Sequence, residues 1–220
     1  MGKYQAVIFD LDGVICFTDE YHYRAWKRIA DELDIPFDRT VNNRLRGVSR
    51  MESLEIILEN NQGEPFSDAE KQSLASDKNE LYKELLTQMS EKDLSAEVKE
   101  TLDTLRTRGL SLAIGSSSKN TPFILSQIGL GNYFDAVSDG NNITHSKPHP
   151  EVFEKAAAML GVKPEYCLVV EDAVSGAEAG HAAGMDVACL GDASEKGAGN
   201  YNLHTFSELK EIVTPARTTE

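Results

Sequence analysis

From about residue 95 onward, short apolar runs alternate with segments of helical character. Together with a run near the N-terminus, these apolar runs predict strands at 5–9, 110–114, 134–138, 166–170 and 186–190. The segments between them predict helices at 95–108, in a stretch ending at Gly129, at 150–160 and at 174–183. Strands that alternate with helices pair in parallel, with helices on both faces of the sheet. The pattern therefore predicts an α/β fold.

The stretch between the first and second of these strands has a different character. Apolar residues from Tyr21 to Leu33 recur at intervals of four, which predicts one helix. Capping boxes at 49–52 and 67–70 predict two more helices, near 50–60 and 68–88. We therefore predict an inserted, all-helical cap domain at 17–92, a core domain built from 1–16 and 93–220, and a frayed tail at 214–220.

The charge of the chain restricts its partners. Its 36 acidic and 22 basic residues give a net charge of −14. Such a surface repels nucleic acid and anionic lipid, so we expect neither as a partner. No segment approaches the roughly 20 apolar residues that a membrane-spanning helix needs. An anionic substrate would have to be drawn in by a local positive cluster.

The three cysteines give an expectation about compartment. Cys16, Cys167 and Cys189 form no CxxC pair, so we do not expect the protein to bind zinc. The odd count and the lack of a secretion signal favour a reducing compartment. We therefore expect a cytoplasmic protein.

Polar residues follow the predicted strands. The first strand runs into Asp10-Leu11-Asp12-Gly13, the second into Ser116, and a later one into Glu171-Asp172, while a loop carries Lys147. In an open parallel sheet, ligands bind beyond the carboxyl ends of the strands. One fold would bring these groups to a single rim.

Several carboxylates at one rim need a cation. At about 4 Å and an effective dielectric of about 20, two carboxylates repel each other by about 4 kcal/mol. An all-oxygen set of ligands selects Mg²⁺. Asp10 and Asp172 are the best side-chain ligands, with Glu171 close by. Asp12 could contribute its backbone carbonyl, which leaves its carboxyl group free.

The same residues predict phosphoryl transfer. Asp10 is placed to attack phosphorus, and Asp12 could act as general acid and base. Ser116, which we expect where a helix begins, and Lys147 could hold the phosphate. Each element alone has an ordinary explanation as a turn, a helix cap or a surface charge. Their joint occurrence at strand ends favours the functional interpretation.

These motifs resemble the haloacid dehalogenase-like superfamily. The resemblance rests on Phe9–Val14, Ser116, Lys147-Pro148 and Glu171-Asp172, and it covers nearly the whole chain. It implies a Rossmann-like core with an inserted helical cap. The second aspartate, Asp12, marks the phosphotransferases of that superfamily. The stretch 139–145, which borders the Lys147 loop, departs from the family pattern, and we assign no catalytic role to His145 or His149.

Within that superfamily the chain is similar to the β-phosphoglucomutase family. The similarity lies in Thr18–His22, in Arg46–Arg50 followed by Ser53, in Lys78-Asn79 and in Ser116–Asn120. It implies that Asp10 is the phosphorylated nucleophile and Asp12 the acid and base, and that Arg50 and Asn120 hold the non-reacting phosphate. The implied contacts to the sugar phosphate are Thr18, His22, Arg50, Ser53, Lys78, Ser116, Ser117, Ser118, Asn120 and Lys147. The implied metal ligands are Asp10, Asp12, Glu171 and Asp172.

The implied reaction converts β-D-glucose 1-phosphate into glucose 6-phosphate through a bound β-glucose 1,6-bisphosphate, with Mg²⁺ as cofactor and a monomeric enzyme. Two alternatives stay open. One is a sugar-phosphate phosphatase with the same core and water as acceptor. The other is a phosphate-binding protein that has lost catalysis, against which the intact acid and lysine set argues.

Overall fold

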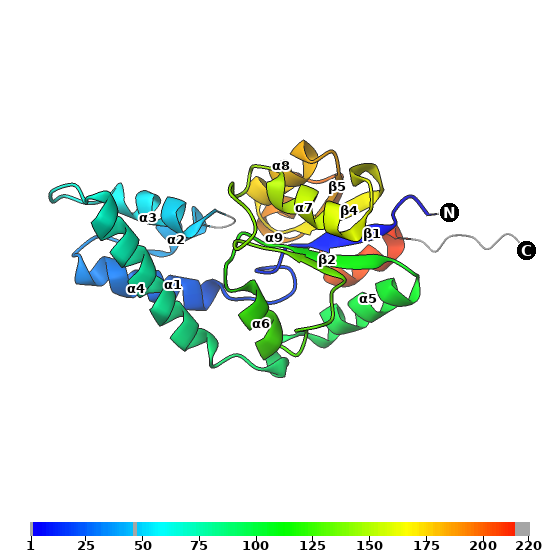
Figure 1. The fold of residues 1–220 in the computed structure, drawn as a ribbon, viewed down its shortest axis with the longest axis horizontal. Helices are drawn as coiled ribbons and strands as arrows, with labels where there is room; N and C mark the ends of the chain where they lie inside the picture. Colours follow the sequence, from blue (N-terminus) through cyan, green and yellow to red (C-terminus); the bar gives the residue numbers. More distant parts are fainter. Residues whose placement is uncertain (1, 46–47, 214–220) are drawn as a thin grey trace, which may run out of the picture.

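The computed structural model describes residues 2–45 and 48–213 (Figure 1). The Arg46-Gly47 pair of the family motif and the predicted tail at 214–220 lie outside the described residues. The chain forms one six-stranded sheet in the order β3-β2-β1-β4-β5-β6, and every pairing is parallel. The strands are β1 (Ala6–Phe9), β2 (Ser111–Gly115), β3 (Ala136–Ser138), β4 (Cys167–Glu171), β5 (Asp186–Cys189) and β6 (Tyr201–Asn202). The predicted parallel α/β sheet is confirmed, and β6 is an addition to the prediction.

The register of the central strands sets the position of the acids. Phe9, the last residue of β1, pairs with Ile114 of β2 and with Val170 of β4. Asp10 and Glu171 therefore lie one residue further on, at the same edge of the sheet. This is the edge at which the sequence predicted the functional rim.

The sheet is covered on both faces. Along β1, Val7 and Phe9 belong to one apolar cluster, and Ala6 and Ile8 belong to another, because successive side chains of a strand point to opposite faces. The first face is packed by α5 (Ala96–Thr107), α6 (Thr121–Gln127) and α10 (Leu209–Ile212). The second is packed by α7 (Glu151–Leu160) and α8 (Val174–Ala182). Figure 1 shows α5 below the sheet and α7 and α8 above it.

Four helices between β1 and β2 form a separate group beside the sheet (Figure 1). They are α1 (Asp19–Glu32), α2 (Arg39–Asn43), α3 (Arg50–Leu58) and α4 (Asp68–Leu86). They pack around their own apolar cluster, which includes Trp26, Ile29, Leu54 and Ile57. Both predicted capping boxes are present at the starts of α3 and α4. The helical character of the insert is confirmed, and the domain division at 17 and 92 stays a prediction.

Some boundaries differ from the prediction. Helix α6 begins only at Thr121, so the prediction that Ser116 lies at the start of a helix is wrong. The sequence did not predict α2, α9 (Gly191–Glu195) or α10. The side chain of Asp38 caps the start of α2 by accepting a hydrogen bond from the Val41 amide. These helices are four or five residues long, too short for a periodic apolar pattern. Within the described residues, no helix combines the length and apolar character that a bilayer crossing requires.

Candidate active site

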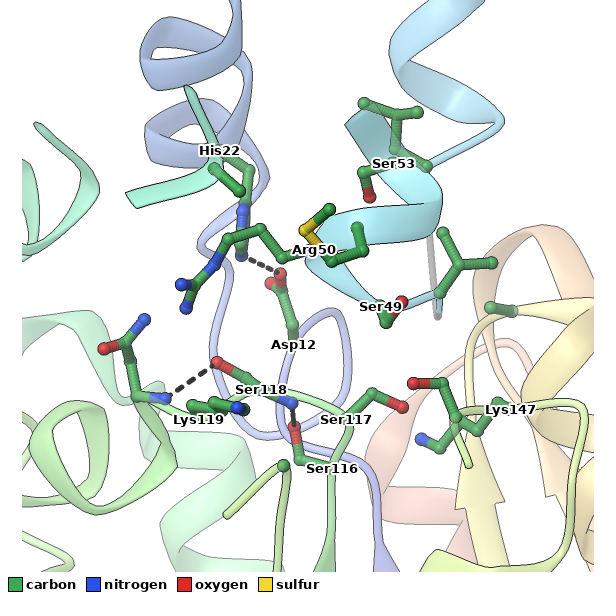
Figure 2. A pocket seen from close by; sticks show the side chains of 18 of the residues that line it. Asp12, His22, Ser49, Arg50, Ser53, Ser116, Ser117, Ser118, Lys119 and Lys147 are labelled. Carbon is green, nitrogen blue, oxygen red and sulfur yellow. Dashed lines mark hydrogen bonds and ion pairs between the residues drawn. The ribbon is translucent and has the colours of Figure 1, made fainter. Parts of the chain in front are cut away.

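A cavity of about 560 Å³ lies between the strand-end rim and the helical group (Figure 2). Every side chain that we predicted for the site lines it, with the exception of Thr18. The rim contributes Asp10, Asp12, Ser116, Ser117, Ser118, Asn120, Lys147, Glu171 and Asp172, and the helical group contributes His22, Arg50, Ser53 and Lys78. The fold thus brings together residues as far apart in the chain as Asp10 and Asp172.

The floor of the cavity holds a buried charge cluster. Lys147, 1% exposed, donates hydrogen bonds to the carboxylates of both Asp10 and Glu171. Asp10 is 8% exposed and Glu171 is 1% exposed. A single ammonium between two carboxylates leaves a net negative charge in a site with little water, which favours the binding of a further cation.

Burial and charge shift the acid–base behaviour of this cluster. Burial raises the pKa of Asp10 to about 7, and Lys147 opposes that rise while Glu171 adds to it. For Lys147, burial alone would lower the pKa, but the two carboxylates raise it above its ordinary value. Lys147 is therefore a permanent cation beside Asp10.

Backbone amides and two glycines determine where the carboxylates of Glu171 and Asp172 lie. Glu171 accepts hydrogen bonds from the amides of Asp172 and Ala173, at 3.0 and 3.1 Å. A Cβ atom on Gly176 would lie 1.9 Å from Glu171 Oε1, and one on Gly13 would lie 2.2 Å from Asp172 Oδ2. Both glycines therefore leave the space that these carboxylates occupy. No local sequence pattern indicates that the neighbour of either glycine is an acid.

The acids meet the geometric requirement for a metal ion. One oxygen from each of Asp10, Glu171 and Asp172 lies within 4.8 Å of the other two. The donors are all oxygen, which suits Mg²⁺. The Gly13 position, where a Cβ would collide with Asp172, keeps the third carboxylate close to the other two. These residues therefore fit the predicted ion.

The carboxyl group of Asp12 is held away from this cluster. Its Oδ1 accepts a hydrogen bond from the Thr18 amide at 2.7 Å, and its Oδ2 lies 3.7 Å from Nε2 of His22 (Figure 2). The hydroxyl of Tyr82 donates to Thr18 Oγ1 at 3.0 Å. Thr18 is fully buried and does not line the cavity. Its backbone orients the carboxyl group that we predicted as acid and base.

Next to Asp12, two basic side chains of the helical group, His22 and Lys78, contact each other. Lys78 is 2% exposed, and its Nζ lies 2.8 Å from His22 Nδ1 and over the rings of Trp26 and Tyr82. Burial, Lys78 and Arg50 hold the pKa of His22 well below its usual range. Burial and Arg50 likewise hold the pKa of Lys78 well below its usual range. Both side chains are therefore disfavoured as cations, and a single hydrogen bond joins their nitrogens.

The loop after β2 is ordered by its own serines. Ser116 Oγ accepts from the Ser118 amide, and Ser118 Oγ accepts from the Asn120 amide, both at 3.2 Å. Asn120 donates in turn to Asn79 Oδ1 on α4 at 3.0 Å, which joins this loop to the helical group. The loop also places Lys119 on the cavity wall. Lys119 belongs to the family motif at 116–120, but the motif alone did not identify it as a site residue.

Arg50 faces this loop across the cavity. It is the first residue of α3, directly after the Ser49 cap, and Ser53 lies one turn later. Figure 2 shows Arg50 reaching into the cavity toward the loop that carries Ser118 and Lys119. Burial lowers the pKa of Arg50 from its ordinary value, although a guanidinium stays charged at neutral pH. Positive groups therefore reach the cavity from both the rim and the helical group.

Comparison with known proteins identifies the family of this chain. The family model for haloacid dehalogenase-like hydrolases matches residues 4–184. A β-phosphoglucomutase of Bacillus subtilis (strain 168) is 44% identical over 182 residues, which cover 82% of this chain and 80% of the relative. The fructose-1-phosphate phosphatase YqaB of Escherichia coli (strain K12) is 32% identical over 188 residues, which cover 84% of this chain and 95% of the relative.

One solved structure resembles this chain over almost the full length of both proteins. The crystal structure of β-phosphoglucomutase from Clostridium difficile matches with a TM-score of 0.89 and 35% sequence identity, and the match covers 94% of this chain and 93% of that chain. Mutases and phosphatases of this kind share the phosphoryl-transfer chemistry that the motifs predicted. The chain therefore belongs to the haloacid dehalogenase-like hydrolase family of phosphoryl-transfer enzymes, and the β-phosphoglucomutases are among its relatives.

Proposed function

We propose that the protein is a β-phosphoglucomutase, which interconverts β-D-glucose 1-phosphate and glucose 6-phosphate through a phosphoaspartate and β-glucose 1,6-bisphosphate. The observation that carries this proposal is the cavity with cationic side chains on opposite walls. Lys147 lies beside Asp10 at the rim, and Arg50 projects from α3 of the helical group. A ligand with phosphate at both ends would bridge the two walls, since each phosphate needs a positive partner.

Asp10 is the proposed nucleophile. Lys147 donates to one oxygen of its carboxylate and stabilises the ionised form that attacks phosphorus. Ser116 and the amides of the following loop can then bind phosphoryl oxygens. We further propose that Asp10, Glu171, Asp172 and the backbone carbonyl of Asp12 hold Mg²⁺. When bound, this ion would supply positive charge to the transferring phosphoryl group.

Asp12 is the proposed general acid and base. The Thr18 amide fixes one of its oxygens, and the neutral His22 faces the other. A carboxyl group oriented in this way can protonate the leaving sugar oxygen and remove a proton from the attacking hydroxyl. The remaining proposed contacts are Ser53, Lys78, Ser117, Ser118 and Asn120. We propose that the helical group, as a cap domain at 17–92, keeps water from the phosphoaspartate.

The main alternative is a sugar-phosphate phosphatase, and the 32% identity to a fructose-1-phosphate phosphatase supports keeping it. The two functions differ in the final acceptor, which is a sugar hydroxyl in the mutase and water in the phosphatase. A panel of α- and β-hexose 1-phosphates, with Mg²⁺ and a trace of the 1,6-bisphosphate, tests them. We expect isomerisation of the β-glucose phosphates with little free phosphate. Phosphate release without isomerisation would refute the mutase.

Arg50 provides a second discriminating test. Arg50→Ala should lower mutase turnover by about 100-fold or more, because the bisphosphate loses its distal partner. A phosphatase acting on a monophosphate would be affected much less. Arg28→Ala is the matched control, since Arg28 is exposed on α1 and pairs with Glu32. No turnover on the whole panel, together with binding of a metal-fluoride phosphate mimic, would indicate a non-catalytic phosphate-binding protein.

A further inference from the structure

A second group of metal-ligating side chains lies outside the active-site cavity. Residues 2–45 and 48–213 contain only two such groups. One is the acid cluster, formed by Asp10, Glu171 and Asp172, and the other is the set His145, His149 and Glu151. The second set lies in the loop before α7 and in the first residue of that helix. The proposed reaction uses none of its three side chains.

The three side chains converge because the loop turns back on itself. The amide of His149 donates to the carbonyl of Ser146 at 3.0 Å, which closes a turn between the two histidines. Their rings stack with centroids 4.6 Å apart and an interplanar angle of 29°. One ligand atom from each of His145, His149 and Glu151 lies within 4.8 Å of the other two.

The carboxylate of this set is fixed, whereas the imidazoles face solvent. Glu151 Oε2 accepts from the amides of Thr144 and His145, at 3.0 and 2.7 Å. Its side chain is 15% exposed, and that of His145 is 63% exposed. An ion can therefore enter from solvent, and water can fill the positions that the protein leaves open.

Lys155 limits the strength of such a site. Its ammonium lies 2.7 Å from Glu151 Oε1 and already balances that carboxylate. The nitrogen Nδ1 of His149 also accepts a weak hydrogen bond, 3.3 Å long, from the Glu151 amide. An ion that binds His149 through Nδ1 must replace that bond, and any ion must share the carboxylate with Lys155. The two imidazoles would therefore provide most of the affinity.

We propose that His145, His149 and Glu151 bind a divalent transition-metal ion such as Zn²⁺ or Co²⁺. Imidazole nitrogens favour these ions, whereas the all-oxygen acid cluster favours Mg²⁺, so the two sites select different metals. Lys147 lies between the two histidines in the chain, and its ammonium contacts Asp10 and Glu171. The ion would thus bind to the segment that supplies the buried lysine.

The test uses the full chain without a histidine tag, in saturating Mg²⁺ to fill the acid cluster. Titration with Co²⁺, followed by its visible absorption, and calorimetry with Zn²⁺ should both give one ion per chain. His145→Ala should weaken binding by about tenfold or more, and the double variant with His149→Ala should abolish it. His204→Ala is the matched control, since His204 is exposed and outside this set, and its affinity should not change.

Two further measurements locate the ion. Glu151→Gln keeps an oxygen for the two amides and should still weaken Zn²⁺ binding, with thermal unfolding showing that the variant is folded. Hydrogen exchange of residues 144–149 should slow on adding Zn²⁺. The proposal is overturned if the double histidine variant binds as well as the parent, if Asp172→Asn abolishes binding, or if neither ion binds the parent.

Discussion

The ammonium of Lys78 on α4 lies 2.8 Å from Nδ1 of His22 on α1, and the two residues are 56 positions apart. A lysine that is only 2% exposed is a costly element of a helix, because its charged form loses hydration. The rings of Trp26 and Tyr82 recover part of that loss through cation–π contacts. Such a residue is expected to serve function at the expense of stability.

Lys78→Met should therefore stabilise the fold and reduce turnover. Burial lowers the pKa of Lys78 from 10.5, so the unfolded chain binds a proton more tightly than the folded protein does. This penalty is present at neutral pH and disappears as the pH rises above 10.5. The gain in melting temperature, about 2 to 4 °C per kcal/mol, should therefore be larger at neutral pH than at pH 10.5.

Thermal unfolding over a pH series measures this effect. Lys83→Met is the control, since Lys83 is on the same helix, exposed, and paired with Glu80. A lower melting temperature in Lys78→Met at neutral pH would contradict the expected destabilising role of the buried ammonium.

Gly176→Ala should disrupt the acid cluster. The added methyl group would lie 1.9 Å from Glu171 Oε1, so the carboxylate that contacts Lys147 must move. We expect a loss of about 1–3 kcal/mol in stability and about 100-fold in turnover. In Gly131→Ala the nearest atom is 3.6 Å away, and that variant should behave like the parent. Unchanged turnover in Gly176→Ala would show that the position of Glu171 is not critical.

Asp172→Asn should weaken Mg²⁺ binding by about tenfold or more, because one of three clustered carboxylates loses its charge. Chelation of Mg²⁺ should abolish turnover of the parent, and added Mg²⁺ should restore it. The dependence of rate on Mg²⁺ concentration gives the affinity. Asp77→Asn, on an exposed residue of α4, is the control. Equal Mg²⁺ dependence of Asp172→Asn and the parent would remove Asp172 from the ion site.

The buried thiols should be unreactive in the native protein. Burial raises the pKa of Cys167 to about 11 and that of Cys189 to about 12, from 9.0. Since the unfolded chain ionises first, the stability that Cys167 contributes is lost as the pH rises from about 9 to about 11. An aromatic disulfide reagent should label no cysteine quickly at neutral pH and all three in denaturant. Cys167→Ala should show a smaller alkaline decline in stability than the parent, because the other raised thiols still contribute. Rapid labelling of the native chain would disagree with this burial.

The sequence predicted which residues lie at the rim of the sheet, but it did not predict the contacts between their side chains. The apolar runs and the acids that follow them depend on local periodicity, and they predicted the parallel sheet and the positions of Asp10 and Glu171. The contact between Lys78 and His22 depends on how two helices pack, which no local pattern encodes. The same holds for Gly176, whose close neighbour is a carboxylate from a different element. Helix α2 was not predicted, because five residues are too few to show the periodic spacing of apolar residues that indicates a helix.

The helical group enters the chain between two strands that pair with each other, β1 and β2. The sheet is therefore complete without it, and the hydrogen-bonded ladder does not depend on the sequence from α1 to α4. Substitutions in those helices can reshape one wall of the cavity while Asp10, the proposed nucleophile, keeps its position directly after β1. An enzyme built in this way can acquire a new substrate by mutation in one continuous stretch of its gene, without having to rebuild its chemistry.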